Sequence, residues 1–191
     1  MKRVFDIISA LFFIILLFPL CLLIGIVIRI NSPGPVLFRQ KRVGRECREF
    51  YIFKFRSMYY NTPANIPTHL LEKPESFITP VGRFLRKTSL DELPQLINIF
   101  KGDMSFVGPR PALYNQKDLI ELREKYKINK VRPGLTGWAQ INGRDALGIS
   151  EKVEYDKFYI DHASIGFDLR ILWGTVFKVV RAKDVIEGGT K

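Results

Sequence analysis

The sequence predicts an α+β protein that is predominantly helical and carries an apolar membrane segment at its N-terminus. Residues 7–28 (IISALFFIILLFPLCLLIGIVI) contain no charged side chain. Five later segments repeat apolar residues at helical spacing, and one short stretch reads as a β-hairpin. The 191 residues, 47% of them hydrophobic, also suffice for one compact domain with its own core.

The apolar run is predicted to remain attached and to sit in lipid. As a helix it would be about 33 Å long, close to the roughly 30 Å hydrocarbon core of a bilayer. It leads into Arg29 without a small-residue cleavage site, which argues against a removed signal peptide. Pro19 near its middle predicts a bend. Cations on both flanks favour a helix-break-helix hairpin with both ends in the cytoplasm, while a kinked spanning helix fits these residues equally well.

The remaining elements follow from turn signals and periodicity. Segments 36–40 (VLFRQ) and 49–58 (EFYIFKFRSM), with Gly44 between them, predict a short β-hairpin that lies either at lipid headgroups or half-buried in the protein. Amphipathic helices are predicted at Pro80–Lys87, Asp91–Lys101 with Gly102 as the stop, Gln116–Tyr126, Ser150–Asp161 and Phe167–Ala182.

The last predicted helix has a broad apolar face. Such a face suits docking on a membrane surface, but core packing is its commoner cause, and we expect core packing here. The residues of this face are Leu169, Leu172, Trp173, Val176, Val179 and Val180.

The charge balance predicts an anionic partner. There are 30 Lys and Arg against 19 Asp and Glu, a formal net charge of +11, which suits anionic membrane lipids, nucleic acid or phosphate-bearing substrates. Two cysteines and two histidines give little support to a disulfide framework, a cysteine-rich zinc site or a histidine-based triad.

The stretch RKTSLDELPQL (86–96) places two acids among cations. Ser89 and Glu92 match a capping box, but a helix that starts at Ser89 would put Pro94 where a backbone donor is needed. With Asp91 as the N-cap, Pro94 falls in the first turn. An ionised Asp91 beside bound phosphate is able to hold Mg²⁺ or to attack phosphorus, although an acid in this position is usually only a cap.

Two Gly- and Pro-rich stretches carry further polar side chains. They are GDMSFVGPRP (102–111) and VRPGLTGWAQINGR (131–144), which predict rigid loops with close backbone approach that present guanidinium groups to phosphates. Neither a P-loop nor a dinucleotide-binding glycine fingerprint accompanies them.

The chain resembles the bacterial sugar transferases, the small monotopic phosphoglycosyl transferases, through several motifs taken together. These motifs are the opening KRVFDI, the apolar segment, SLDELPQLINIFKGDMSFVGPRP, RPGLTGWAQINGR and EYDKFY. The resemblance covers nearly the whole chain. It implies transfer of a sugar 1-phosphate from a UDP-sugar to polyprenyl (undecaprenyl) phosphate with release of UMP, at the cytoplasmic face of the bacterial inner membrane. It further implies a Mg²⁺-dependent, two-step mechanism in which Asp91, also a metal ligand, is the nucleophile and Glu92 its dyad partner.

The resemblance also assigns substrate-binding residues and an organisation. A re-entrant membrane anchor at residues 1–30, broken at Pro19, would precede one cytoplasmic catalytic domain at 31–191. Family members often have Ser before this proline, whereas this chain has Phe18, so the proline must produce most of the bend. The implied substrate-binding residues are Lys54, Arg86, Pro109, Arg110, Pro111, Gln140, Arg144, Asp156 and Asp168.

The alternative is a membrane-tethered basic scaffold or lipid-binding protein without catalysis, which would not need the acid pair. A nucleic-acid binder is not expected, because no recognition helix or aromatic platform stands out and the chain carries a membrane segment. A homo-oligomer is compatible with the sequence. The particular UDP-sugar, the polyprenyl length and the glycan pathway do not follow from it.

Overall fold

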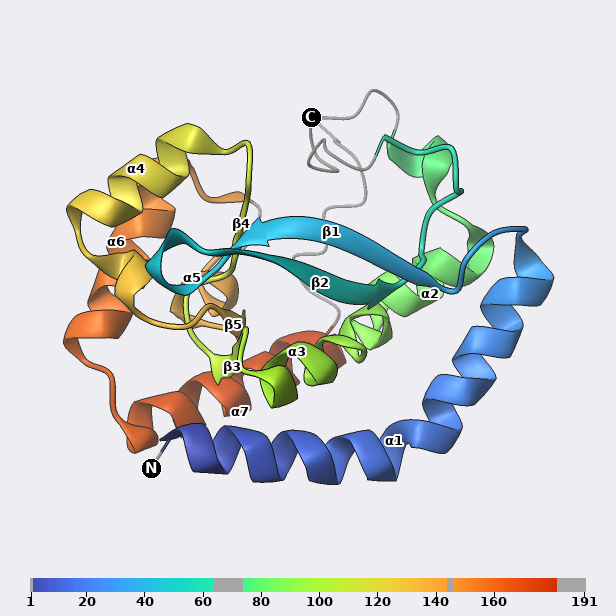
Figure 1. Ribbon diagram of the computed structural model, residues 1–191, viewed down its shortest axis with the longest axis horizontal. Coiled ribbons are helices and arrows are strands. Elements are labelled where there is room, and N and C mark those ends of the chain that lie inside the picture. The colour runs from blue at the N-terminus through green and yellow to red at the C-terminus, as the bar shows by residue number, and fades with distance from the viewer. Residues whose placement is uncertain (1, 64–73, 144–145, 182–191) are drawn as a thin grey trace.

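The structure, a computed structural model, describes residues 2–63, 74–143 and 146–181. Across these ranges the chain forms seven α-helices, a three-stranded sheet and a separate two-stranded sheet (Figure 1). The predicted class, a predominantly helical α+β protein, is confirmed.

Helix α1 (Lys2–Asn31) is the predicted apolar segment and is long and apolar enough to cross a membrane. Its most apolar 18-residue window is only 11% buried, so most of these side chains face outward. Figure 1 shows α1 as two arms that meet at a bend, and Pro19 lies inside the helix. Proline removes one backbone donor and crowds the preceding turn, which is the physical cause of such a bend.

The β-hairpin is confirmed. Strands β1 (Leu37–Val43) and β2 (Glu49–Phe55) pair antiparallel along their full length, and β4 (Ala112–Leu113) adds to the other edge of β1. A second, parallel pair joins β3 (Ser105–Val107) to β5 (Gly134–Thr136), and the sequence did not predict it.

The parallel pair brings the two Gly- and Pro-rich stretches together. A Cβ atom on Gly134 would lie 2.1 Å from the backbone nitrogen of Gly108, so only glycine permits this contact. The predicted close backbone approach is thereby confirmed, and its partner is the other stretch of the same kind.

The predicted helices are found with small shifts at their ends. Helix α2 (Pro80–Lys87) has the predicted bounds, and the Thr79 hydroxyl accepts a hydrogen bond from the Gly82 N–H at 2.9 Å as its N-cap. Gly102 ends α3 with φ 103°. The other predicted helices are α3 (Gln95–Lys101), α4 (Lys117–Lys125), α6 (Ile149–Asp161) and α7 (Ile165–Arg181). The short α5 (Trp138–Ile141) was not predicted, since it lies in the stretch 131–144 that was expected to be a loop. In Figure 1, α4 and α6 lie at one end of β1 and β2, α2 lies at the other end, and α3, α7 and α1 lie below.

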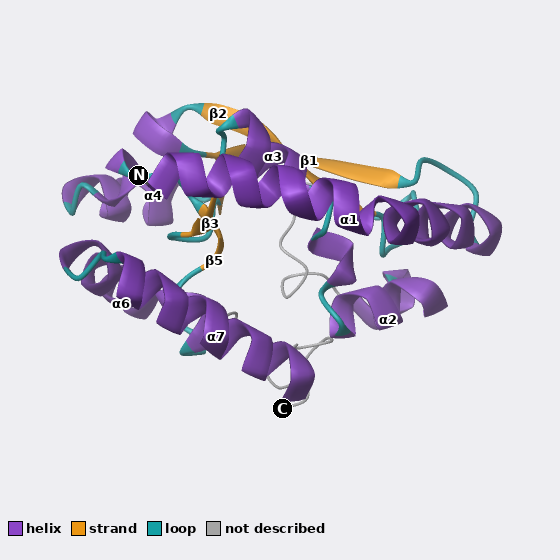
Figure 2. Ribbon diagram, turned by 90° about the horizontal axis from the view of Figure 1, so that it is seen from below, coloured by secondary structure: helices purple, strands orange, loops and turns teal. Residues whose placement is uncertain are grey.

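The expectation of core packing for the apolar face of α7 is wrong in large part. Leu169, Trp173 and Val176 are 54%, 75% and 58% exposed, whereas Ile171 on the other side of the helix is buried. Figures 1 and 2 place α7 on the same side of the molecule as the first arm of α1. Periodicity identifies an apolar face but not its neighbour, because protein core and lipid both favour apolar side chains.

Helix α1 packs against the rest of the chain through two hydrophobic clusters. Ala10 of its first arm packs with Leu96 and Ile99 of α3, and Ile24 and Ile28 of its second arm pack with other core residues that include Leu85 of α2. Helix α1 therefore supports the helices on either side of the acid pair.

Candidate active site

The acid pair lies in a 3-10 turn, Leu90–Glu92, between α2 and α3. The expectation that Asp91 is the N-cap of an α-helix is wrong, because α3 begins only at Gln95, with Pro94 as its N-cap. Tight backbone bonds from Glu92 N to Ser89 O and from Leu93 N to Leu90 O form the turn instead. Ser89 precedes it in the left-handed region with φ 57° and makes no side-chain cap, so the capping box is not formed either.

Cations from two distant segments hold the pair. The Lys54 Nζ of β2 donates to Glu92 Oε1 at 2.7 Å and lies 3.9 Å from Asp91 Oδ2. An Arg110 N–H donates to the same Glu92 oxygen at 2.9 Å. Both acids are buried, at 8% and 9% exposure, so these contacts work in a medium of low polarity where charges interact strongly. The Glu92 carboxylate therefore faces these cations, while the Ser89 N–H, which a capping box would use, donates to the Arg86 oxygen at 3.2 Å.

The electrostatics of Asp91 reflect two opposing effects. Burial, and to a lesser extent the negative charge of Glu92, raise the pKa of its carboxyl above the usual value, and the charges of Lys54, Arg86 and Arg110 act against that rise. Burial likewise lowers the pKa of the Lys54 ammonium, which Glu92 and Asp91 oppose. The Asp91 carboxylate and the Lys54 ammonium therefore each favour the charged form of the other. A bound phosphate would add negative charge beside both groups.

A second layer fixes the loop that carries Arg110. Arg123 of α4 donates to the Arg110 backbone oxygen at 2.8 Å, and Asp156 of α6 accepts from the Arg123 Nε at 3.0 Å. Asp156 is 1% exposed, and in the structure it holds Arg123, which in turn holds the loop of Arg110. Its predicted contact with substrate stays a prediction. On either side of Arg110, the Pro109 and Pro111 oxygens accept from the Gly134 N–H and the Arg42 side chain.

A cavity of about 260 Å³ opens beside the acid pair, and Glu92, Arg110 and Gln140 all line it. Both amide atoms of Gln140 are buried and have no hydrogen-bond partner among the described residues. A Cβ atom on Gly137 would lie 2.8 Å from Gln140 Oε1 and 2.1 Å from the Gly108 oxygen, so Gln140 lies next to the loop that leads to Arg110. An unpaired amide of this kind is available to a ligand.

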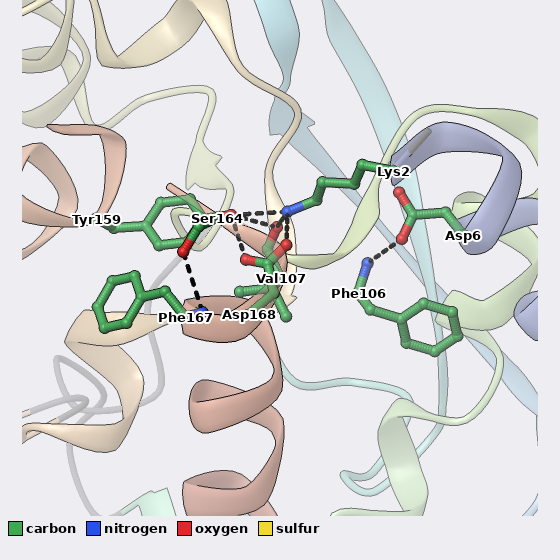
Figure 3. A network of polar contacts seen from close by, with 8 residues as sticks. All are labelled: Lys2, Asp6, Phe106, Val107, Tyr159, Ser164, Phe167 and Asp168. Atoms are coloured by element: carbon green, nitrogen blue, oxygen red, sulfur yellow. Dashed lines mark hydrogen bonds and ion pairs between the residues drawn. The ribbon is translucent and has the colours of Figure 1, made fainter. Parts of the chain in front are cut away.

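Asp168 lies in a different network, shown in Figure 3. Lys2, in the first turn of α1, donates to Asp168 Oδ2 at 2.6 Å and to the Val107 oxygen at 3.0 Å. The Tyr159 hydroxyl donates to Asp168 Oδ1 at 2.8 Å. Asp168 thus ties the start of α1 to α7 and β3, and its predicted role in substrate binding stays a prediction. Arg144, also predicted to bind substrate, lies outside the described residues.

Sequence reasoning missed several residues that position the site. Arg123 gave no local signal, because its partners Asp156 and Arg110 are distant along the chain. The sequence also predicted no contact of Lys2 or Arg3 with the folded domain. In the structure Arg3 donates to the Ile99 and Phe100 oxygens at the end of α3. Their place directly ahead of the apolar run, in KRVFDI, was the available signal.

The acid pair suits a divalent cation only together with a substrate. The described residues contain no group of three or more His, Cys, Asp or Glu side chains placed to hold a metal ion. Mg²⁺, however, is commonly held by one or two carboxylates plus substrate phosphates. Asp91, ringed by cations that would also attract phosphate, fits that pattern.

Comparison with known proteins identifies the family. The model of the bacterial sugar transferases matches residues 1–182, so the chain belongs to that family. The UDP-glucose:undecaprenyl-phosphate glucose-1-phosphate transferase of Escherichia coli (strain K12) is 44% identical over 185 residues, which cover 93% of this chain and 40% of that protein.

Two further relatives show the range of the family. The uncharacterized sugar transferase EpsL of Bacillus subtilis (strain 168) is 40% identical over 97% of this chain and 90% of its own length. The UDP-N-acetylgalactosamine-undecaprenyl-phosphate N-acetylgalactosaminephosphotransferase of Aeromonas hydrophila is 39% identical over 92% of this chain and 42% of its own. The chain thus spans about two fifths of the E. coli and A. hydrophila proteins and most of EpsL.

Proposed function

We propose that this protein transfers a sugar 1-phosphate from a UDP-sugar to polyprenyl phosphate, releasing UMP and leaving a polyprenyl diphosphosugar. The observation that carries the proposal is the buried Asp91-Glu92 pair held by Lys54 and Arg110 in a chain of this family. The names of the relatives support the two substrates, since they include UDP-sugar:undecaprenyl-phosphate transferases.

In the first step Asp91 attacks the phosphorus that carries the sugar. A bond forms between a carboxylate oxygen and that phosphorus, the bond from phosphorus to the oxygen bridging it to UMP breaks, and UMP leaves with the electron pair. Arg110 and Lys54 offset the negative charge that accumulates as two anions approach. Glu92 holds both cations in place through a single oxygen, Oε1.

In the second step a phosphate oxygen of the acceptor attacks the same phosphorus. The new bond completes the diphosphate, the bond to Asp91 breaks, and the carboxylate is regenerated. Mg²⁺ would be held in the free site by Asp91 together with phosphate oxygens of the bound UDP-sugar, and it would supply positive charge that offsets the negative charge of the phosphates. Both steps bring an anionic nucleophile to a negatively charged phosphate group, so Arg110 and Lys54 offset negative charge in each of them.

The test is release of UMP in the absence of acceptor. With the correct UDP-sugar and Mg²⁺ we expect a burst of at most about one UMP per active site, and mass spectrometry should find the sugar phosphate on the Asp91 peptide. Asp91→Asn should abolish the burst, since a neutral amide is a poor nucleophile, and chelation of Mg²⁺ should stop the wild type. Near-normal UMP release by Asp91→Asn would refute the assignment.

We also propose that α1 enters and leaves the bilayer on the cytoplasmic face of the inner membrane. The bend in α1, the proline within the helix and the cations at both of its ends support this arrangement. A further support is that Lys2 and Arg3, before the apolar run, bond to the same domain that continues after it.

Thiol labelling tests this topology. A cysteine in a short tag ahead of Lys2, and Arg48→Cys on the exposed hairpin turn, are each placed in a chain without Cys21 and Cys47. Both should resist an impermeant reagent in intact cells and react after permeabilisation. Labelling of either one from outside would establish a spanning helix instead.

A further inference from the structure

The cavity beside the acid pair is polar at one end and apolar over most of its wall. Glu92 and Arg110 form the polar end, while Lys87 and Lys178 add two more cations to the lining. Branched aliphatic side chains from α3, β5, α5 and α7 make up most of the rest, including Leu96, Leu135, Ile141, Leu172, Val176 and Val179.

This lining suits an apolar chain that ends in a phosphate. The sugar and uridine of a UDP-sugar carry many donors and acceptors, and burial of these against aliphatic walls would cost their hydration without replacing it. The hydroxyls of Thr136 and Thr175 already bond to each other at 2.7 Å, which reduces what the wall offers to a polar ligand. The unpaired Gln140 amide lies next to the loop that carries Arg110, so it also serves the phosphate end.

The apolar wall adjoins exposed apolar surfaces of α1 and α7, where Phe13 and Val176 are 39% and 58% exposed. Leu96, Phe106 and Leu135 belong to the same hydrophobic cluster as Ala10 of α1. The rings of Phe106 and Phe13 of α1 also make an edge contact, with centroids 6.3 Å apart. On the other wall, Val176 both lines the cavity and belongs to the exposed apolar face of α7.

We propose that this cavity binds the first isoprene units of the polyprenyl phosphate acceptor, which enters from the bilayer along α7 with its phosphate directed to Arg110. The inference rests on the proposed function and adds to it the site of the lipid acceptor. At about 260 Å³ the cavity takes only the start of the chain, so the remaining units stay in the membrane.

Because the first half-reaction uses only the UDP-sugar and the second uses the acceptor, the effect of a variant on each substrate can be measured separately. Val176→Trp places a bulky side chain at the mouth of the cavity, and Leu169→Trp is its matched control. Leu169 lies on the same face of α7, is similarly exposed at 54% against 58%, and is not part of the cavity lining. The UMP burst without acceptor counts folded active sites in every variant.

We expect Val176→Trp to keep the burst amplitude and the UDP-sugar dependence of the wild type. Its KM for polyprenyl phosphate should rise roughly tenfold, as expected when about two methylene groups of the acceptor lose their burial. Leu169→Trp should match the wild type in both half-reactions. A milder Val176→Phe should give an intermediate rise if Val176→Trp folds poorly.

An isoprenyl phosphate with a photoreactive group on its first unit gives a second measurement. It should label peptides of α5 or α7, and polyprenyl phosphate should compete with it. A changed dependence of the burst on UDP-sugar concentration in Val176→Trp would assign the cavity to the sugar nucleotide and overturn the inference. An unchanged KM for polyprenyl phosphate in Val176→Trp, together with photolabelling of peptides outside α5 and α7, would also overturn it. A wild type without any burst would instead refute the proposed function itself.

Discussion

Replacement of Lys54 by Met should change how the rate of the UMP burst depends on pH, so that the fall in rate on the acid side, the acid limb, occurs at higher pH. The Lys54 ammonium lies 3.9 Å from the Asp91 carboxylate, and both groups are largely buried. Burial raises the pKa of Asp91, and the positive charge of Lys54 is the largest influence that lowers it. Without that charge the pKa of Asp91 rises further, so protonation disables the nucleophile at a higher pH.

The direction of the shift follows from the distance. An opposite charge within about 4–6 Å favours the ionised form of a carboxyl group, and the Lys54 ammonium lies within that range of Asp91. We therefore expect the acid limb to move to higher pH when that charge is removed. Arg86 and Arg110 remain to limit the rise, since both also act to lower the pKa of Asp91.

The assay is the pre-steady-state rate of UMP release without acceptor, measured across the acid range. Lys54→Arg keeps the charge and should leave the limb close to that of the wild type. Lys41→Met on the neighbouring strand removes a charge that is paired with Glu49 and controls for net charge. A limb that stays in place in Lys54→Met, or moves to lower pH, would refute the electrostatic reasoning.

Three further variants test the surrounding structure. Asp156→Asn leaves the buried Arg123 without its carboxylate, so unfolding by denaturant should show a loss of about 3–5 kcal/mol; a change below about 1 kcal/mol would contradict this. Gln140→Leu removes a buried amide without a partner, so stability should hold or rise while substrate KM increases; an unchanged KM would exclude a ligand contact. Asp168→Asn weakens the bond to Lys2, and proteolysis or hydrogen exchange should show faster opening at the start of α1, while Lys41→Met should not.

Local signals in the sequence were enough for the β-hairpin and for the approximate positions of five of the helices. Helix α2 has the predicted bounds because Thr79 and Pro80 start it by contacts within a single turn. Local signals failed at Asp91, where the capping argument considered only neighbours along the chain. The carboxylate of Glu92 instead bonds to Lys54 and Arg110, 38 and 18 residues away, and the backbone forms a 3-10 turn.

The candidate site was predictable in its chemistry but only partly in its arrangement. The adjacent acids and the Pro109-Arg110-Pro111 element are visible as motifs, and the structure brings Arg110 to Glu92. The support of Arg110 by Arg123 and Asp156 gave no local pattern, because it depends on how α4 packs against α6.

The sequence by itself determined the fold class, the apolar segment with its proline, the family and the acid pair, because composition, periodicity and motifs are properties of the chain. Only the tertiary structure decided which cations hold the pair, that β3 and β5 bring the two glycine-rich stretches into backbone contact, and that much of the apolar face of α7 is exposed. These features depend on contacts between segments far apart in the chain. The free energy of such contacts is settled by packing and burial, which no local pattern records.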